Sequence, residues 1–359
     1  MRVSILISSH NYARFLGEAI DSALAQRDGG PDGLPVPEVE VIVCDDASSD
    51  GSDAVIRRYG TRIRHWISPD NRGQASMMNA AMALSTGDWV LFLDADDRLE
   101  PQALAHCLER LCAEPDGGRD VAKIQFLLRC VDREGRCMSR TIPYLMHDGD
   151  VRPLIRRFGG YGGPPSSGNL YRRSAIARYF PLVEADWRRA ADTPPFILAP
   201  FHGRVLGIDE ALGAYRIHSG ANRARGCFGN IAARHADTLR VDLHRREASL
   251  ALLARHGGER IEGPFLPAPW NLRTRVLSWR TEPQRHPYRH DDALRLLRLQ
   301  ARSLRECPGY TRPERYASQL WLMAMLVAPT SLASRMAVTN TSGRLRRWLR
   351  RLRPDTAVA

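Results

Sequence analysis

Residues 89–97 read WVLFLDADD, an apolar run that ends directly in three carboxylates. A short run of aliphatic and aromatic residues closed by polar ones predicts a buried β-strand. Three similar runs precede it, at 3–7, 39–44 and 63–67. An amphipathic segment with helical spacing follows each of the four runs. These segments are 15–25, 52–59, 74–84 and 101–112. This regular alternation predicts an α/β fold with a mainly parallel sheet and helices on both faces.

Polar side chains are concentrated where the four predicted strands end. Ligands of such sheets bind beyond the carboxyl ends of the strands, so these residues are the first candidates for chemistry. They are Ser8 to Asn11, Asp45 to Ser52, Asp70 to Gln74 and Asp94 to Asp97. Ser48 to Asp50 can also be read as an ordinary helix N-cap, because Ser and Asp accept hydrogen bonds from free backbone amides.

The N-cap explanation does not extend to Asp94, Asp96 and Asp97. Three carboxylates within four residues repel one another and raise each other's pKa unless a cation lies between them. Mg²⁺ or Mn²⁺ fits carboxylates that share a metal ion with phosphate oxygens. No GxGxxG follows the first strand, and no GxxxxGK[ST] occurs in the chain. The sequence therefore predicts a phosphate ligand that is held through a metal ion and not by a glycine-rich loop.

These motifs, in this order, resemble the family 2 glycosyltransferases, which have the GT-A fold: a Rossmann-like, mainly parallel sheet sandwiched by helices. The resemblance covers about residues 3–223. It begins with the first strand and its turn, where His10 replaces the usual tyrosine, although His10 can also be a surface turn residue. It continues in the motifs VCDDASSDG at 43–51, NRG at 71–73 with Asn79, LDADD at 93–97 and YRIH at 215–218.

The resemblance implies that a nucleoside diphosphate sugar, with uracil as the expected base, binds along these strand ends. The implied donor contacts are Ser8, Asp45, Asp46, Arg72, Asn79, Asp96 and Arg216. Asp96, Asp97 and His218 would hold Mn²⁺ or Mg²⁺, although His218 can also be a packed histidine at the end of a strand. The metal would neutralise the charge that develops on the leaving diphosphate.

The resemblance also implies an acceptor site. The segment PPSSGNLYR at 164–172 is similar to the acceptor-side strand of one branch of the family. Ser167, Gly168 and Asn169 are therefore the implied acceptor contacts, although Asn169 can equally be a turn residue.

Asp192 falls where the same branch places its catalytic base, and Glu184 and Asp186 are the competing carboxylates. Ala191 precedes Asp192 and two prolines follow it, which departs from the family pattern. The helix that usually carries the base is therefore expected to start later or to be irregular.

The implied reaction is a metal-dependent single displacement with inversion at the anomeric carbon. It would move a sugar to a hydroxyl group of a glycan or lipid-linked acceptor in polysaccharide or cell-envelope synthesis. Two alternatives remain open at this point: a nucleotidyltransferase, and a non-catalytic protein that binds nucleotide sugars.

Positive charge is concentrated at the end of the chain, which has 359 residues and a formal net charge of +12. Residues 270–359 contain eighteen arginines and six acidic residues, so they carry the whole excess. Residues 344–353 place four apolar side chains on one helical face among six arginines, which is typical of a helix that lies on an anionic membrane. A solvated tail is the alternative. We do not expect nucleic acid binding, because the neutral remainder has no basic and aromatic stripe.

Two regions are expected: a catalytic domain at 1–225 and a helical basic region at 226–359, with a linker near 263–269. The N-terminus lacks the long apolar segment of a secretory signal, and the longest apolar run, 320–328, is too short to span a bilayer. We therefore expect a cytoplasmic protein bound peripherally to the inner face of the cell membrane. The chain has seven cysteines, an odd number, and no CxxC pair, so the sequence predicts neither a zinc site nor a disulfide framework.

Overall fold

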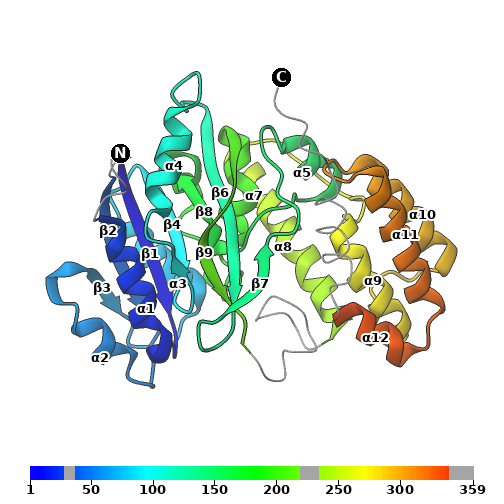
Figure 1. Cartoon of the computed structure of the whole chain (residues 1–359), viewed down its shortest axis with the longest axis horizontal. Helices are drawn as coiled ribbons and strands as arrows, with labels where there is room; N and C mark the ends of the chain where they lie inside the picture. Colours follow the sequence, from blue (N-terminus) through cyan, green and yellow to red (C-terminus); the bar gives the residue numbers. More distant parts are fainter. Residues whose placement is uncertain (28–36, 219–233, 339–359) are drawn as a thin grey trace. The chain divides into compact units, whose positions relative to one another are not determined.

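The computed structural model describes residues 1–27, 37–218 and 234–338 (Figure 1). The chain divides into two compact units. The first comprises residues 1–155, 161–216 and 248–261, and the second comprises residues 156–160, 217–247 and 262–359.

The first unit is built on one nine-stranded sheet. The strand order is β3-β2-β1-β4-β8-β6-β9-β5, and β7 pairs with β6. β1 pairs in parallel with β2 and β4, and β2 pairs in parallel with β3, as the sequence predicts. β8 runs antiparallel to both of its neighbours, whereas β6 and β9 form a second parallel pair. The bounds are β1 Arg2–Ser9, β2 Glu38–Asp45, β3 Arg64–Ile67, β4 Trp89–Asp94, β5 Arg98–Leu99, β6 Val121–Val131, β7 Cys137–Ile142, β8 Asn169–Arg172 and β9 Arg204–Arg216.

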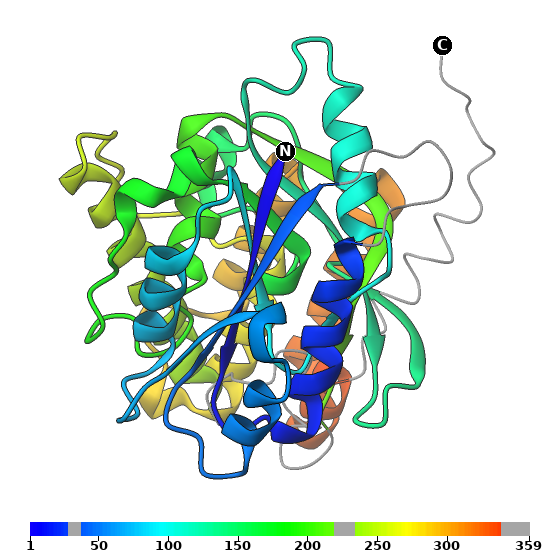
Figure 2. The same ribbon diagram turned by 90° about the vertical axis from the view of Figure 1, so that its left-hand side faces the viewer.

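Helices cover both faces of the parallel part of this sheet. Figure 2 shows α1, in dark blue, and α3, in lighter blue, on opposite sides of β1. Met78 and Ala81 of α3 belong to one buried cluster with Ile42 of β2 and Phe92 of β4. Alternate residues of a strand point to opposite faces, so a continuous apolar strand supplies both layers. The helices up to residue 198 are α1 Ala13–Leu24, α2 Ser52–Arg57, α3 Gln74–Leu84, α4 Ala103–Cys112, α5 Arg152–Phe158, α6 Arg173–Ile176 and α7 Thr193–Leu198.

The parallel strands end together at one edge of the sheet. In the register of the sheet, Ser8 lies opposite Cys44 on one side and opposite Asp94 on the other. The strands extend one residue beyond their apolar runs, so Asp45 and Asp94 are the last residues of β2 and β4. The carboxylates found in the sequence are therefore fixed by the sheet itself and do not sit on free loops.

The second unit is helical in the residues described. Its helices are α8 His235–Arg255, which extends into the first unit, α9 Pro269–Thr281, α10 Ala293–Glu306, α11 Arg312–Val327 and α12 Thr330–Val338. Leu272 and Val276 of α9, Leu296 of α10 and Leu322 of α11 pack together in its core. α11 begins with a capping box, in which the side chains of Thr311 and Glu314 bind each other's backbone N–H groups.

The sequence predicts a linker near 263–269; residues 263–268 have neither helix nor strand but are packed, and Pro269 already begins α9. The backbone N–H of Leu266 donates to the carbonyl of Arg157 at 3.0 Å, and the Ser303 hydroxyl donates to the carbonyl of Pro267 at 2.8 Å. The predicted amphipathic helix at 344–353 lies outside the described residues. None of the described helices combines the length and apolar character that crossing a bilayer requires.

Candidate active site

Three loops meet at the carboxyl ends of β1, β2 and β3. The carboxylate of Asp46 accepts hydrogen bonds from the backbone N–H groups of Arg72, at 2.7 Å, and Gly73, at 2.8 Å. His10 Nδ1 lies 2.7 Å from the carbonyl oxygen of Asp46 and 3.1 Å from Asn71 Nδ2. The structure therefore joins the loop after β1, the loop after β2 and the loop at 70–73 into one rim.

The loop after β2 is held in a fixed shape by side chains. Asp45 accepts hydrogen bonds from both the backbone N–H of Ser48, at 2.9 Å, and its hydroxyl, at 2.6 Å. The side-chain oxygen Oδ1 of Asn11 accepts from the backbone N–H of Ser49 at 2.8 Å. Asn11 and Ala47 both have positive φ, 59° and 53°, a conformation that costs energy outside glycine. The polar contacts compensate for that strain, so the rim is preformed.

These contacts give Asp45 and Asp46 structural tasks that the sequence did not indicate. Both carboxylates are buried and both are engaged with loop backbone. Their proposed hydrogen bonds to a nucleotide base would be made in addition to these contacts. Ser8, by its register beside Asp94, is half-buried at the centre of the same edge.

The turn after β4 is tied to the acceptor-side segment. The Ser167 hydroxyl donates to the Asp97 carboxylate at 2.6 Å and accepts from the backbone N–H of Asp94 at 3.1 Å. The other Asp97 oxygen accepts from the backbone N–H of Arg216 at 2.9 Å. Both Asp97 oxygens therefore have protein donors, and Asp97 is 2% exposed. Ser167 joins the two sides of the site instead of contacting solvent.

Arg216 holds the same turn from β9. Its Nε donates to the carbonyl of Asp96 at 2.8 Å, and its guanidinium forms an ion pair with Glu18 and lies 4.7 Å over the ring of Phe15. Only 4% of Arg216 is exposed. The sequence suggested a contact with the diphosphate, but this guanidinium is committed to protein groups. We therefore assign Arg216 to positioning Asp96.

The carboxylates of the site face one another. Burial, followed by the charges of Asp96 and Asp192, raises the pKa of Asp94 well above its usual value. Burial, with Asp96 and Asp94, does the same to the pKa of Asp97. Burial and the charges of Asp96, Asp94 and Asp97 also raise the pKa of Tyr12, a residue that the sequence did not single out. Asp192, distant in sequence, is therefore within electrostatic range of the Asp94–Asp97 turn.

A divalent cation fits the chemistry of this turn. Burial and neighbouring negative charges raise the pKa values of Asp94 and Asp97, so a positive charge is favourable there, and hard oxygen ligands suit Mg²⁺ or Mn²⁺. Within the described residues, no group of three or more His, Cys, Asp or Glu side chains is arranged so that it could hold a metal ion by itself. Phosphate oxygens and water would have to complete the coordination. His218 is half-buried, two residues beyond the end of β9.

Asp192 directly precedes α7, and its carbonyl accepts the backbone N–H of Phe196. Pro194 and Pro195 occupy the first turn of that helix, where a missing N–H costs nothing. The helix is irregular, as expected: it has six residues and continues as a 3₁₀ turn over 199–202. It does not start late.

The two competing carboxylates lie elsewhere. Glu184 forms a bidentate ion pair with Arg72, at 2.8 and 3.0 Å, and Asp186 is exposed. The same ion pair engages Arg72, which the resemblance assigned to the diphosphate. Asn79 also has protein partners: its side-chain amide donates to the carbonyl of Leu182 at 2.9 Å and accepts from its N–H at 2.7 Å.

The acceptor-side residues are buried. Asn169 is 1% exposed and its amide donates to the carbonyl of Pro165 at 2.6 Å. A Cβ at Gly168 would lie 2.6 Å from Pro164 Cβ and 2.9 Å from the carbonyl of Phe126, so this position requires glycine. Both residues shape the segment behind the site. Of the three implied acceptor residues, Ser167 alone contacts the carboxylate turn in the described hydrogen bonds.

A buried lysine supports the helix that follows Asp192. Lys123 Nζ donates to Gln125 Oε1 at 3.0 Å and to the Tyr161 hydroxyl at 2.8 Å, and it lies 3.9 Å from the centre of the Phe196 ring. Tyr161 in turn donates to the carbonyl of Phe196 in α7 at 3.0 Å. Burial lowers the pKa of Lys123 well below its usual value. The sequence offered one signal for this residue: it is the only lysine in a chain with 52 basic residues.

Comparison with known protein families gives a match for the first half of the chain. The model of the family described as Glycosyl transferase family 2 matches residues 4–180. An uncharacterised glycosyltransferase of Nostoc sp. is 34% identical over 229 residues, 62% of this chain and 66% of that protein. Chondroitin synthase of Escherichia coli is 31% identical over 140 residues, 38% of this chain and 18% of the synthase. The chain thus spans less than two thirds of the length of either relative.

Among solved structures, S. aureus TarS residues 1–349 in complex with UDP-GlcNAc superpose with a TM-score of 0.52 and 14% identity. The superposition covers 97% of this chain and 92% of that chain. TarS 1–349 in complex with UDP gives a TM-score of 0.51 and 15% identity. At these identities the likeness concerns the fold, and it confirms the GT-A fold expected from the sequence.

Proposed function

Because the chain belongs to glycosyl transferase family 2, we propose that it transfers a sugar from a nucleoside diphosphate sugar to a hydroxyl group of a glycan or lipid-linked acceptor in polysaccharide or cell-envelope synthesis. One observation carries the proposal. At the carboxyl edge of the parallel strands, burial and the charges of neighbouring aspartates raise the pKa values of Asp94 and Asp97, with Asp192 among the charges acting on Asp94; this is a place where a cation is favourable.

The donor would be UDP-linked and would bind along the rim formed by the loops after β1 and β2 and by residues 70–73. The preformed backbone of this rim supports the proposal, since a fixed loop loses little entropy on binding. TarS, which shares the fold, has been solved with UDP and UDP-GlcNAc. Ser8, Asp45 and Asp46 are the proposed contacts nearest the base, and Arg72 and Asn79 those beyond it.

Asp96 and Asp97, with His218, would hold Mn²⁺ or Mg²⁺ at the edge of the sheet. The ion would stabilise the negative charge that develops on the leaving diphosphate. Asp96 is the main proposed ligand, because the Asp97 oxygens already accept from Ser167 and Arg216. His218 is included because it lies two residues from Arg216, whose backbone binds Asp97.

Asp192 would accept the proton of the acceptor hydroxyl as general base in an inverting single displacement. Two observations support this choice: the charge of Asp192 contributes to the raised pKa of Asp94, and the rival Glu184 is paired with Arg72. Ser167, Gly168 and Asn169 would shape the acceptor side from behind. Arg216 would hold the carbonyl of Asp96 and so fix the turn.

Residues 1–225 are the proposed catalytic domain, and residues 226–359 a basic helical region that brings the enzyme to the inner face of the cell membrane. The charge of the last ninety residues supports this placement. The compact units do not follow this proposed boundary throughout, since residues 248–261 belong to the first unit.

The test is an assay of several nucleotide sugars with a glycan or lipid-linked acceptor, with Mn²⁺ and with a chelator. Metal-dependent release of nucleoside diphosphate, absent in Asp96→Asn, is the expected result. Release of pyrophosphate would instead identify a nucleotidyltransferase. Binding of nucleotide sugars without any product would identify a non-catalytic protein.

A further inference from the structure

The outward face of α11 is apolar along its length. Tyr316, Leu320, Met323 and Val327 are 72%, 63%, 43% and 82% exposed. Their spacing of four, three and four residues places them on one side of the helix, opposite the buried Leu322. No charged residue occurs between positions 316 and 327. A continuous exposed stripe of large apolar side chains marks a surface that binds something.

The neighbouring helix α10 presents a basic face. α10 packs directly against α11. Arg295, Arg298, Arg302 and Arg305 are all exposed and recur on the side of α10 opposite its buried Leu296. Arg302 forms an ion pair with Glu306 at 2.8 Å. Within the described residues, Arg298 and Arg305 have no carboxylate at ion-pair distance.

We propose that the outward faces of α10 and α11 together form a surface that binds an anionic lipid membrane. Apolar side chains beside a row of arginines are the combination that suits the boundary between lipid headgroups and acyl chains. α11 has sixteen residues and no described helix could cross a bilayer, so the helix would lie in the interface. This surface is distinct from residues 344–353 and does not depend on them.

Charge selects the lipid over two other occupants. A second copy of the chain would bring one arginine row against another in a symmetric interface, which like charges disfavour. Residues 344–353 contain six arginines, so covering the surface with that segment meets the same repulsion. Anionic lipid headgroups are complementary to the arginines, and acyl chains are complementary to the α11 stripe.

The experiment is flotation of the full chain with vesicles of phosphatidylcholine alone or mixed with phosphatidylglycerol. Two double variants test the two faces: Leu320→Gln with Val327→Gln, and Arg298→Gln with Arg305→Gln. All four side chains are exposed, so the fold should persist, and circular dichroism checks it. Matched controls are Val183→Gln, and Arg57→Gln with Arg119→Gln, which are exposed residues of the first unit.

The wild type and both controls should bind the mixed vesicles and not phosphatidylcholine alone. The arginine variant should bind about thirtyfold more weakly, since each arginine near an anionic surface is worth roughly fivefold. The leucine and valine variant should lose at least about tenfold, and added salt should weaken wild-type binding.

Unchanged binding by both double variants would overturn the proposal and assign attachment to another part of the chain. So would a Leu320→Gln with Val327→Gln variant that dissociates an oligomer while lipid binding stays the same, because the surface would then join two copies. Activity of all variants on a soluble acceptor should match the wild type, which separates this surface from the catalytic proposal.

Discussion

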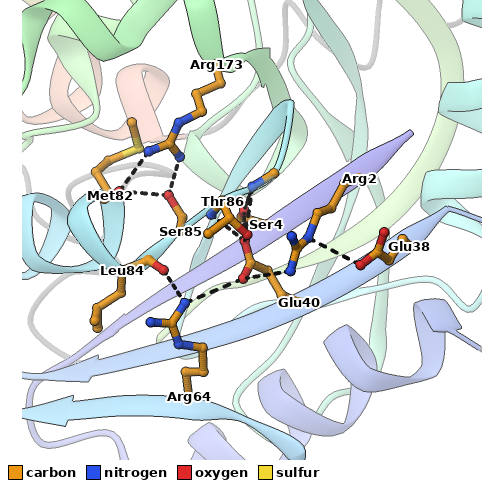
Figure 3. Close-up of polar contacts among 11 residues, drawn as sticks. Arg2, Ser4, Glu38, Glu40, Arg64, Met82, Leu84, Ser85, Thr86 and Arg173 are labelled. Carbon is orange, nitrogen blue, oxygen red and sulfur yellow. Dashed lines mark hydrogen bonds and ion pairs between the residues drawn. The ribbon is translucent and has the colours of Figure 1, made fainter.

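Near the amino ends of β1 and β2, the buried carboxylate of Glu40 has hydrogen-bond donors and cations around it. At the carboxyl edge of the same sheet, the carboxylates of Asp94 and Asp97 lie among other negative charges. Glu40 accepts hydrogen bonds from the Ser4 hydroxyl at 2.5 Å and from the backbone N–H groups of Thr86 and Gly87 at 2.6 and 3.0 Å (Figure 3). Arg2 and Arg64 each lie 3.8 Å from its other oxygen. Burial disfavours the charged form, but these partners outweigh it, so the pKa of Glu40 is lowered.

The opposite end has the reverse balance. Asp94 and Asp97 have raised pKa values because burial is joined by the charges of other aspartates. If stability alone determined these residues, the carboxylates at both ends of the strands would be expected to have compensating partners. The Glu40 cluster stabilises the fold, and the raised pKa values in the aspartate turn support the proposed binding of a cation there.

The largest expected effect comes from Asp96→Asn. Turnover should fall by roughly 10³ or more, because the change removes a ligand of the proposed metal ion, whose charge would stabilise the leaving diphosphate. The stability of the metal-free protein should not fall, since one repelling carboxylate is gone. Measurement of nucleoside diphosphate release and of thermal unfolding without metal checks both statements. Full activity in a chelator would refute the metal assignment.

Asp192→Asn should lower kcat by about 10² and leave the KM for the donor within a few-fold, because a general base acts in the transition state. Glu184→Gln is the matched control, since its carboxylate is paired with Arg72 at the protein surface. If the control lost kcat and Asp192→Asn did not, the base would have been misplaced.

Glu40→Gln tests the other side of the comparison. It should lower the free energy of unfolding by about 2 kcal/mol, because the amide replaces a charged acceptor of several buried donors. Turnover per folded molecule should be unchanged. Urea unfolding and activity of the same samples give both values, and a loss of turnover without loss of stability would mean that this cluster is not merely structural.

The smallest effect is the pH dependence of that difference. The pKa of Glu40 is lower in the folded than in the unfolded protein. Its contribution to the free energy of unfolding is therefore complete above the unfolded-state pKa of about 4.3, and it is lost as the pH falls through the folded-state pKa. The stability of the wild type should therefore approach that of Glu40→Gln in acid. Urea titrations of both proteins at several pH values measure this, and a gap that widened in acid would contradict it.

The parallel half of the fold and the edge that carries the acids were predictable, because short apolar runs ending in Asp are a local signal. Asp45 and Asp94 therefore appeared in the sequence where the sheet places them. Contacts between distant segments were not predictable. The hydrogen bond from Ser167 to Asp97 was not predicted, and the acceptor-side role of Ser167 stays a prediction. The ion pair of Arg216 with Glu18, 198 residues earlier, was not predicted either, and the contact of Arg216 with a diphosphate stays a prediction.

Long-range contacts between polar side chains and backbone groups were the hardest to predict. Asn79 and Glu40 act through partners that no spacing rule links to them. Side-chain patterns reveal periodicity and strand ends, but they do not say which backbone group a polar side chain will meet after the chain has folded.

Lys123 gives the chain a built-in chemical probe. It is the only lysine, and none of its surface is accessible in the folded protein. An acylating reagent can reach its amine only when β6, Tyr161 and α7 separate. The rate at which Lys123 is acylated therefore reports the opening of the part of the sheet behind Asp192, without any engineered label. A donor or acceptor that closes the site should slow that reaction. The decrease in rate would measure how strongly binding suppresses the separation of β6, Tyr161 and α7.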